Sequence, residues 1–114
     1  MSKVVALAPD LFFASKIEAT LTAAGHDVVL ESTASAAVVS AAGADVVVAD
    51  LHSPGLDLSD YAARLRDRPI LGFYSHVDAA AREAAERAGF DLVVPRSRMA
   101  REMPELVARL ASVG

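Results

Sequence analysis

The chain has 114 residues, of which 54% are hydrophobic and 23% are charged, and its formal net charge at pH 7 is −4. This length and apolar content predict one folded domain over residues 1–114. The chain has no cysteine, which excludes disulfides and thiolate metal sites. It has no apolar run of about 18 residues that could span a membrane. It also has no run of Lys or Arg of the kind that binds nucleic acid.

Strands and helices alternate from the N-terminus, which lacks the pattern of a secretory signal, so we expect a cytoplasmic protein. The apolar run Lys3–Leu7 predicts a strand, and Asp10 is placed to cap a helix over Leu11–Ala24. A second strand over His26–Leu30 precedes an alanine-rich segment, Ser32–Ala42, which has the periodicity of a helix.

The middle of the chain contains its densest run of valine. The segment Ala44–Ala49 predicts a strand buried on both faces of a parallel sheet, with Asp50 at its carboxyl end. We expect a loop over Leu51–Ser59, a short helix over Asp60–Arg66 and a fourth strand over Pro69–Tyr74.

The C-terminal third continues the alternation. A helix over Asp78–Ala88, capped by its first residue, precedes a fifth strand over Asp91–Val94. Because proline is tolerated mainly near a helix start, Pro104 predicts a turn over Ser97–Glu102 and a last helix over Met103–Ser112. Five strands alternating with five helices predict an α/β fold, a doubly wound parallel sheet with helices on both faces.

The segment Asp50–Gly55 resembles the phosphoacceptor aspartate of response-regulator receiver domains, which is followed four residues later by a proline, here Pro54. Ala88-Gly89, followed by Asp91 and an apolar strand, is similar to the exit of the fourth receiver helix. The resemblance covers the whole chain. It implies a flavodoxin/CheY-like three-layer α/β/α fold with strand order 2-1-3-4-5.

The metal-binding part of the receiver pattern is missing. Receivers carry two acidic residues after their first strand, which hold Mg²⁺ together with the phosphoacceptor, and here those positions are Ala8 and Pro9. Asp10 follows one residue later. Because Mg²⁺ prefers several oxygen ligands in octahedral array, we expect no metal site and no cofactor beside Asp50.

Other receiver positions are also changed. The Thr or Ser after the fourth strand falls on Tyr74 or Ser75, and the Lys after the fifth strand falls on Arg96. A buried carboxylate without a partner is costly, so we expect Arg96 to pair with Asp50. The residual pocket predicted from the resemblance therefore combines Asp50 and Asp10 with the set Tyr74, Ser75, His76 and Arg96.

This pattern is similar to a pseudo-receiver, which implies a stand-alone, non-enzymatic signalling module that binds protein partners. A second copy of the chain is one such partner, through the face made by the fifth strand and its flanking helices. A phosphorylatable single-domain response regulator using Asp50 is the first alternative.

The segment Asp50–Gly55 also spells D-x-H-x-x-G, which resembles the His loop of cobalamin-binding domains. A small-molecule site on a rim made by His52 and His76, with Asp78 nearby, is therefore a second alternative. In the simpler interpretation His52 is an exposed loop residue and Asp78 is a helix cap.

Two further features leave alternatives open. Arg96, Arg98 and Arg101 form either an anion- or partner-docking patch or a solvated turn. Phe12 stands beside Phe13 at the start of the first helix, and the two cannot share one face. Phe12 either packs against the loops or lies exposed as a contact for a partner.

Overall fold

The computed structural model describes residues 2–75 and 78–112. Within these ranges one parallel sheet runs through the molecule in the order β2-β1-β3-β4-β5, which confirms the predicted fold class and strand order. The strands are β1 (Lys3–Leu7), β2 (Asp27–Glu31), β3 (Val46–Asp50), β4 (Ile70–Tyr74) and β5 (Leu92–Pro95).

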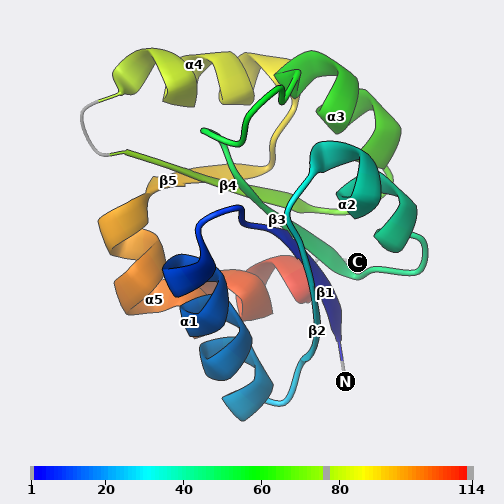
Figure 1. The fold of residues 1–114 in the computed structure, drawn as a ribbon, viewed down its shortest axis with the longest axis vertical. Helices are drawn as coiled ribbons and strands as arrows, with labels where there is room; N and C mark the ends of the chain where they lie inside the picture. The colour runs from blue at the N-terminus through cyan, green and yellow to red at the C-terminus, as the bar shows by residue number, and fades with distance from the viewer. Residues whose placement is uncertain (1, 76–77, 113–114) are drawn as a thin grey trace.

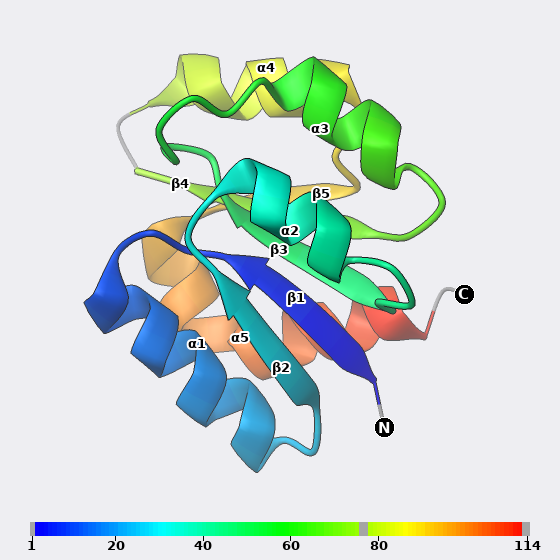
Figure 2. The same cartoon turned by 45° about the vertical axis from the view of Figure 1, so that its right-hand side comes forward.

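Helices cover both faces of this sheet. They are α1 (Leu11–Ala23), α2 (Ala34–Ser40), α3 (Leu58–Leu65), α4 (Ala79–Ala88) and α5 (Arg96–Ala111). Figures 1 and 2 show α1 and α5 on one face and α2, α3 and α4 on the other. None of the helices in the described ranges combines the length and apolarity needed to cross a bilayer.

The sheet separates two hydrophobic cores, because successive side chains of a strand point to opposite faces. On β3, Val46 and Val48 pack toward α1 and α5, whereas Val47 and Ala49 pack toward the other three helices. Every residue of β3 and β4 is buried, and for β3 the dense run of valine predicts this. These two strands are the rigid base on which the loops at their carboxyl ends stand.

Side-chain caps fix most of the helix starts. Asp10 and Asp78 accept backbone N–H groups at the starts of α1 and α4, so both predicted caps are confirmed. Asp57 does the same for α3 through the N–H of Asp60. The helix therefore begins at Leu58, inside the segment predicted to be loop, because its cap lies three residues before the predicted start.

The predicted turn over Ser97–Glu102 is wrong, because α5 is one helix from Arg96 to Ala111 with Pro104 inside it. The cause is burial. Met99 and Met103 are fully buried and lie on the same stripe of the helix as the buried Leu106. Burial of each methionine stabilises the fold by about 1.5–3 kcal/mol. The two together offset the destabilisation of roughly 3 kcal/mol that a proline causes inside a helix.

Candidate functional site

Asp50 ends β3 at the edge of the sheet where the parallel strands terminate. The residue is only 6% exposed. Its Oδ1 accepts the backbone N–H of His52 at 2.9 Å, and its Oδ2 accepts from the Arg96 guanidinium (Nη2) at 3.3 Å. The Ser53 hydroxyl donates to the Asp50 carbonyl oxygen at 2.7 Å, which closes a tight turn after the strand. Both carboxylate oxygens of Asp50 therefore have protein donors.

Asp10 holds a similar position in the loop after β1. Its Oδ1 accepts the backbone N–H groups of Phe12 at 3.0 Å and Phe13 at 3.4 Å, which caps α1. Its Oδ2 accepts from Arg96 Nη1 at 3.2 Å. The N–H of Phe13, then that of Phe12 and the Arg96 guanidinium, lower the pKa of the Asp10 carboxyl below its ordinary value, against an opposing effect of desolvation.

Arg96 joins the two carboxylates. It is the first residue of α5, and its guanidinium carbon lies 4.6 Å from the ring centroid of Phe13 and 5.8 Å from that of Phe73. The flat guanidinium thus rests on aromatic rings while its two amino groups reach Asp10 and Asp50. The predicted pair of Arg96 with Asp50 is present. The contact with Asp10 was not predicted.

The residues at this edge of the sheet do not fit a magnesium ion. At both Asp10 and Asp50, one carboxylate oxygen contacts the guanidinium and the other accepts backbone N–H groups. Ala8 and Pro9 supply no side-chain oxygen. Across the described part of the chain, no three His, Asp or Glu side chains are grouped as metal ligands. The donor set therefore offers a guanidinium where a hard cation needs free oxygens.

His52 is an exposed loop residue, as the simpler interpretation predicted, and its side chain also connects two loops. Its side chain is partly exposed, yet its Nε2 accepts the backbone N–H of Ser75 at 3.0 Å, and its Nδ1 lies 3.9 Å from Asp78 Oδ2. Because Nε2 accepts a hydrogen bond, the ring proton of neutral His52 sits on Nδ1 and faces Asp78. This bridge depends on how β3 and β4 are staggered, which residue spacing does not reveal.

Four of the side chains at this edge line a small cavity of about 220 Å³: Asp50, His52, Ser75 and Arg96.

Tyr74, also predicted for this pocket, instead packs in the core under α2, α3 and α4. The reason is the strand period. Phe73 pairs with Asp50 across the sheet and shares the α1–α5 face with Phe13, so its neighbour Tyr74 points to the opposite face. His76 lies outside the described residues.

The remaining candidates lie next to this cavity or on the surface. Phe12 is 92% exposed, so it does not pack against the loops. Arg98 and Arg101 both contact Glu102, at 3.2 and 3.4 Å. The Arg98 guanidinium, more than that of Arg101, lowers the pKa of the Glu102 carboxyl. These two arginines therefore form a helical ion-pair cluster with an acidic residue.

Comparison with models of known protein families gives no match, and neither does comparison with curated protein sequences. Solved structures do match. The chain is similar to a response-regulator receiver domain from Clostridium thermocellum (TM-score 0.86, 15% identity, 98% of this chain and 95% of that one). It is also similar to the receiver domain of the Francisella response regulator 1452 (TM-score 0.85, 19% identity, 98% of each chain).

A third similar structure is the receiver domain of a sensor histidine kinase from Pseudomonas aeruginosa, with a magnesium ion coordinated in its active-site cleft. The TM-score is 0.83 at 21% identity, over 97% of this chain and 98% of that one. At these identities the matches establish the fold, which is the CheY-like receiver fold.

Replacing Arg96 by alanine should lower the free energy of unfolding by about 1–3 kcal/mol. The change leaves the buried Asp50 carboxylate without its cationic partner and uncovers the rings of Phe13 and Phe73. Arg98→Ala is the matched control, because Arg98 lies on the same helix and is about as exposed as Arg96, but its partner Glu102 is not buried. Urea unfolding measures both. Equal losses in the two variants would contradict a special role for Arg96.

The lowered pKa of Asp10 predicts a pH-dependent contribution to stability. A carboxyl with a depressed pKa stabilises the folded state above its unfolded pKa, and this contribution is lost as pH falls through the folded pKa. Asp10→Asn keeps a capping oxygen but removes the charge. Urea unfolding midpoints of wild type and variant should be measured from pH 7 down to about pH 2. The difference between the two midpoints should become smaller as the pH falls. A constant difference would exclude the charge as its cause.

Proposed function

We propose that residues 1–114 form one receiver-like domain that works as a non-enzymatic signalling module through protein contacts, without magnesium-dependent phosphorylation. The observation that carries this proposal is the bridge of the Arg96 guanidinium between Asp50 and Asp10. This bridge supports the proposal because a cationic side chain of the protein lies beside Asp50, where phosphoryl transfer to an aspartate needs a metal ion.

The geometry of Asp50 supports the same conclusion. A phosphoacceptor must present a carboxylate oxygen to the incoming phosphorus, and developing charge on the phosphoryl group must be neutralised. Here Oδ2 faces a guanidinium that is packed over two aromatic rings and tied to a second carboxylate. Attack by Oδ2 would require Arg96 to leave that position, and attack by Oδ1 would break the hydrogen bond that Oδ1 accepts from the backbone N–H of His52.

A phosphorylatable single-domain response regulator is the second candidate. The receiver fold and the place of Asp50 at the end of β3 favour it. A cobalamin-like site on His52 has less support, because both ring nitrogens of His52 already face protein groups, the N–H of Ser75 and the carboxylate of Asp78.

The proposed partner is a protein in the cytoplasm. The first candidate is a second copy of the chain, which would bind through the α4–β5–α5 face. The exposed side of α4 carries both signs of charge, with Arg82 paired to Glu86 at 3.8 Å and Glu83 nearby on the surface. Such a face suits a weak, charge-matched contact. Leu11 and Phe12 form a separate, small exposed apolar patch at the start of α1, beside the Arg96 site.

Sedimentation velocity from micromolar to millimolar concentration tests the homodimer. We expect reversible association of the wild type that Glu83→Arg abolishes, because the substitution breaks the charge match on α4. Glu18→Arg, an equal charge reversal on the exposed side of α1, should leave association unchanged. A wild type that stays monomeric throughout would exclude the homodimer and leave a different protein as partner.

Incubation with Mg²⁺ and either acetyl phosphate or beryllofluoride tests the absence of phosphorylation. Intact mass should not change with acetyl phosphate, and the backbone amide signals of Asp50 and His52 should not shift with beryllofluoride. The matched control is the triple variant Ala8→Asp, Pro9→Asp, Arg96→Lys, which rebuilds the receiver pattern and should gain one phosphoryl group. Adding Asp50→Asn should abolish that gain.

Stoichiometric phosphorylation of the wild type, lost in Asp50→Asn alone, would overturn the proposal in favour of the second candidate. Circular dichroism of each variant establishes that a negative result reflects chemistry and not unfolding.

A further inference from the structure

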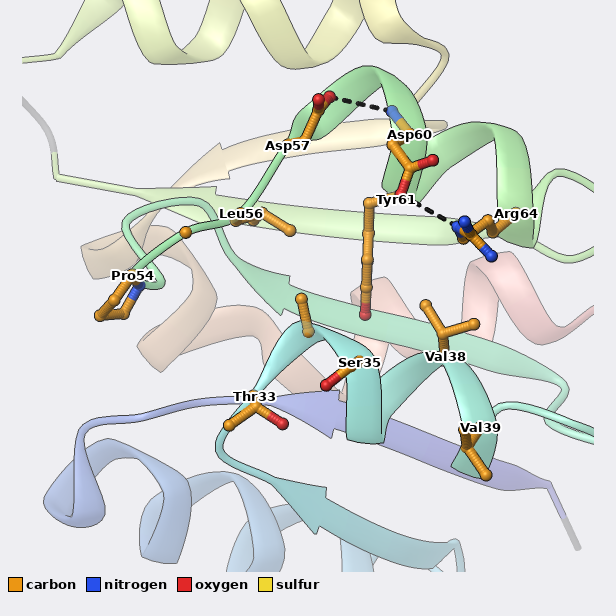
Figure 3. A pocket seen from close by; sticks show the side chains of 12 residues that line it. Thr33, Ser35, Val38, Val39, Pro54, Leu56, Asp57, Asp60, Tyr61 and Arg64 are labelled. Carbon is orange, nitrogen blue, oxygen red and sulfur yellow. Dashed lines mark hydrogen bonds and ion pairs between the residues drawn. The ribbon is translucent and has the colours of Figure 1, made fainter.

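A cavity separates α2 from α3 on the face of the sheet opposite the α1–α5 core. Its volume is about 590 Å³, within the range of roughly 300–1,000 Å³ in which proteins bind small molecules. Figure 3 shows its walls: α2 on one side, and on the other the loop after β3 together with α3. It shares no lining residue with the small cavity around Asp50.

Tyr61 supplies a polar group that the protein itself does not use. Its side chain is 2% exposed and extends from α3 toward α2 (Figure 3). Its hydroxyl has no hydrogen-bond partner among the described residues. A buried donor without an acceptor is unfavourable, and native proteins rarely retain one without a reason. Burial raises the pKa of the Tyr61 phenol well above its ordinary value, so the group remains an O–H donor.

The rest of the wall combines apolar surface with the hydroxyl side chains of Thr33 and Ser35 and a limited set of charges. Val38, Val39 and Leu56 give it apolar surface, and Val39 is 78% exposed at the rim. Asp60 accepts from Arg64 Nε at 2.9 Å. The second carboxylate on this wall, Asp57, caps α3, so the lining carries two acidic residues and one arginine. This balance disfavours ligands with several negative charges.

We propose that the α2–α3 cavity binds a small molecule with an apolar body and a single carbonyl or carboxylate oxygen, which accepts the hydrogen bond of the Tyr61 hydroxyl. The apolar body rests on Val39 and its neighbours at the rim. This inference is independent of the proposed function, because it uses no residue of the Arg96 site.

The attachment of α2 explains how the ligand reaches the hydroxyl. The helix has seven residues, and Ala37 is the one that is fully buried. Ala34 and Val38 are only partly buried against the same core, so a small displacement of α2 can open the cavity toward the Tyr61 hydroxyl. The ligand then replaces the missing acceptor and ties α2 to α3.

Amide NMR titrations with four probes test the ligand chemistry. Phenylacetamide offers a neutral carbonyl, phenylacetate a single carboxylate, isophthalate two carboxylates, and phenethylamine no acceptor. We expect saturable shifts in Ala34–Ser40 and Leu58–Leu65 with at least one of the first two probes, and at least fivefold weaker binding of the last two. If neither phenylacetamide nor phenylacetate shifts these helices, or if phenethylamine binds as well as they do, the proposal is wrong.

Tyr61→Phe separates the hydroxyl from the fold. Without ligand this variant should melt at the same temperature as wild type or higher, because it removes an unsatisfied donor, while the probe that binds should bind about fivefold more weakly. A lower melting temperature, or unchanged affinity, would overturn the proposal.

A second pair of variants tests the place of binding. Val39→Ala should weaken binding through lost apolar contact at the rim. Leu11→Ala is the matched control, because Leu11 is equally exposed, at 78%, but lies on α1 away from the cavity. Equal affinity in the two variants would place the probe elsewhere on the surface and overturn the proposed site.

Discussion

The interaction on which the carboxyl edge of the sheet depends is the two-ended contact of the Arg96 guanidinium with Asp50 and Asp10. It joins the start of α5 to the loop after β1 and to the end of β3, so three segments distant in sequence share one group. Removing Arg96 costs more than breaking a surface ion pair, because it leaves the buried Asp50 carboxylate unpaired and uncovers Phe13. Removing any member leaves another without its partner.

The period of the strands decides which side chains take part. Asp50 and Phe73 lie opposite each other in β3 and β4 and serve the α1–α5 face, where Phe13 completes the aromatic base for Arg96. The same alternation sends Tyr74 into the other core. The site is therefore a consequence of register, since a one-residue slip of β4 would exchange Phe73 for Tyr74 beneath the guanidinium.

The α/β fold class was predictable from sequence because its signals are local: dense valine in β3, and the aspartates Asp10 and Asp78 that cap helices. The strand order followed from the resemblance to receiver domains. The pair of Arg96 with Asp50 was predictable from the resemblance, since Asp50 ends β3 and Arg96 follows β5 at the same edge of the sheet. The failures have non-local causes. Pro104 lies inside a helix because tertiary burial of Met99 outweighs local preference, and the contact of His52 with Ser75 depends on strand stagger.

The carboxyl edge of the sheet and the α2–α3 cavity differ in how completely their polar groups are satisfied. At the carboxyl edge, each carboxylate oxygen of Asp50 and Asp10 has a donor, so the arrangement is complete without any added component. Between α2 and α3, the Tyr61 hydroxyl has no acceptor beside a cavity large enough for a small molecule. A chemical input is therefore easier to accommodate at the α2–α3 cavity than at the carboxylate, since binding there satisfies a donor and binding at Asp50 must first break an ion pair.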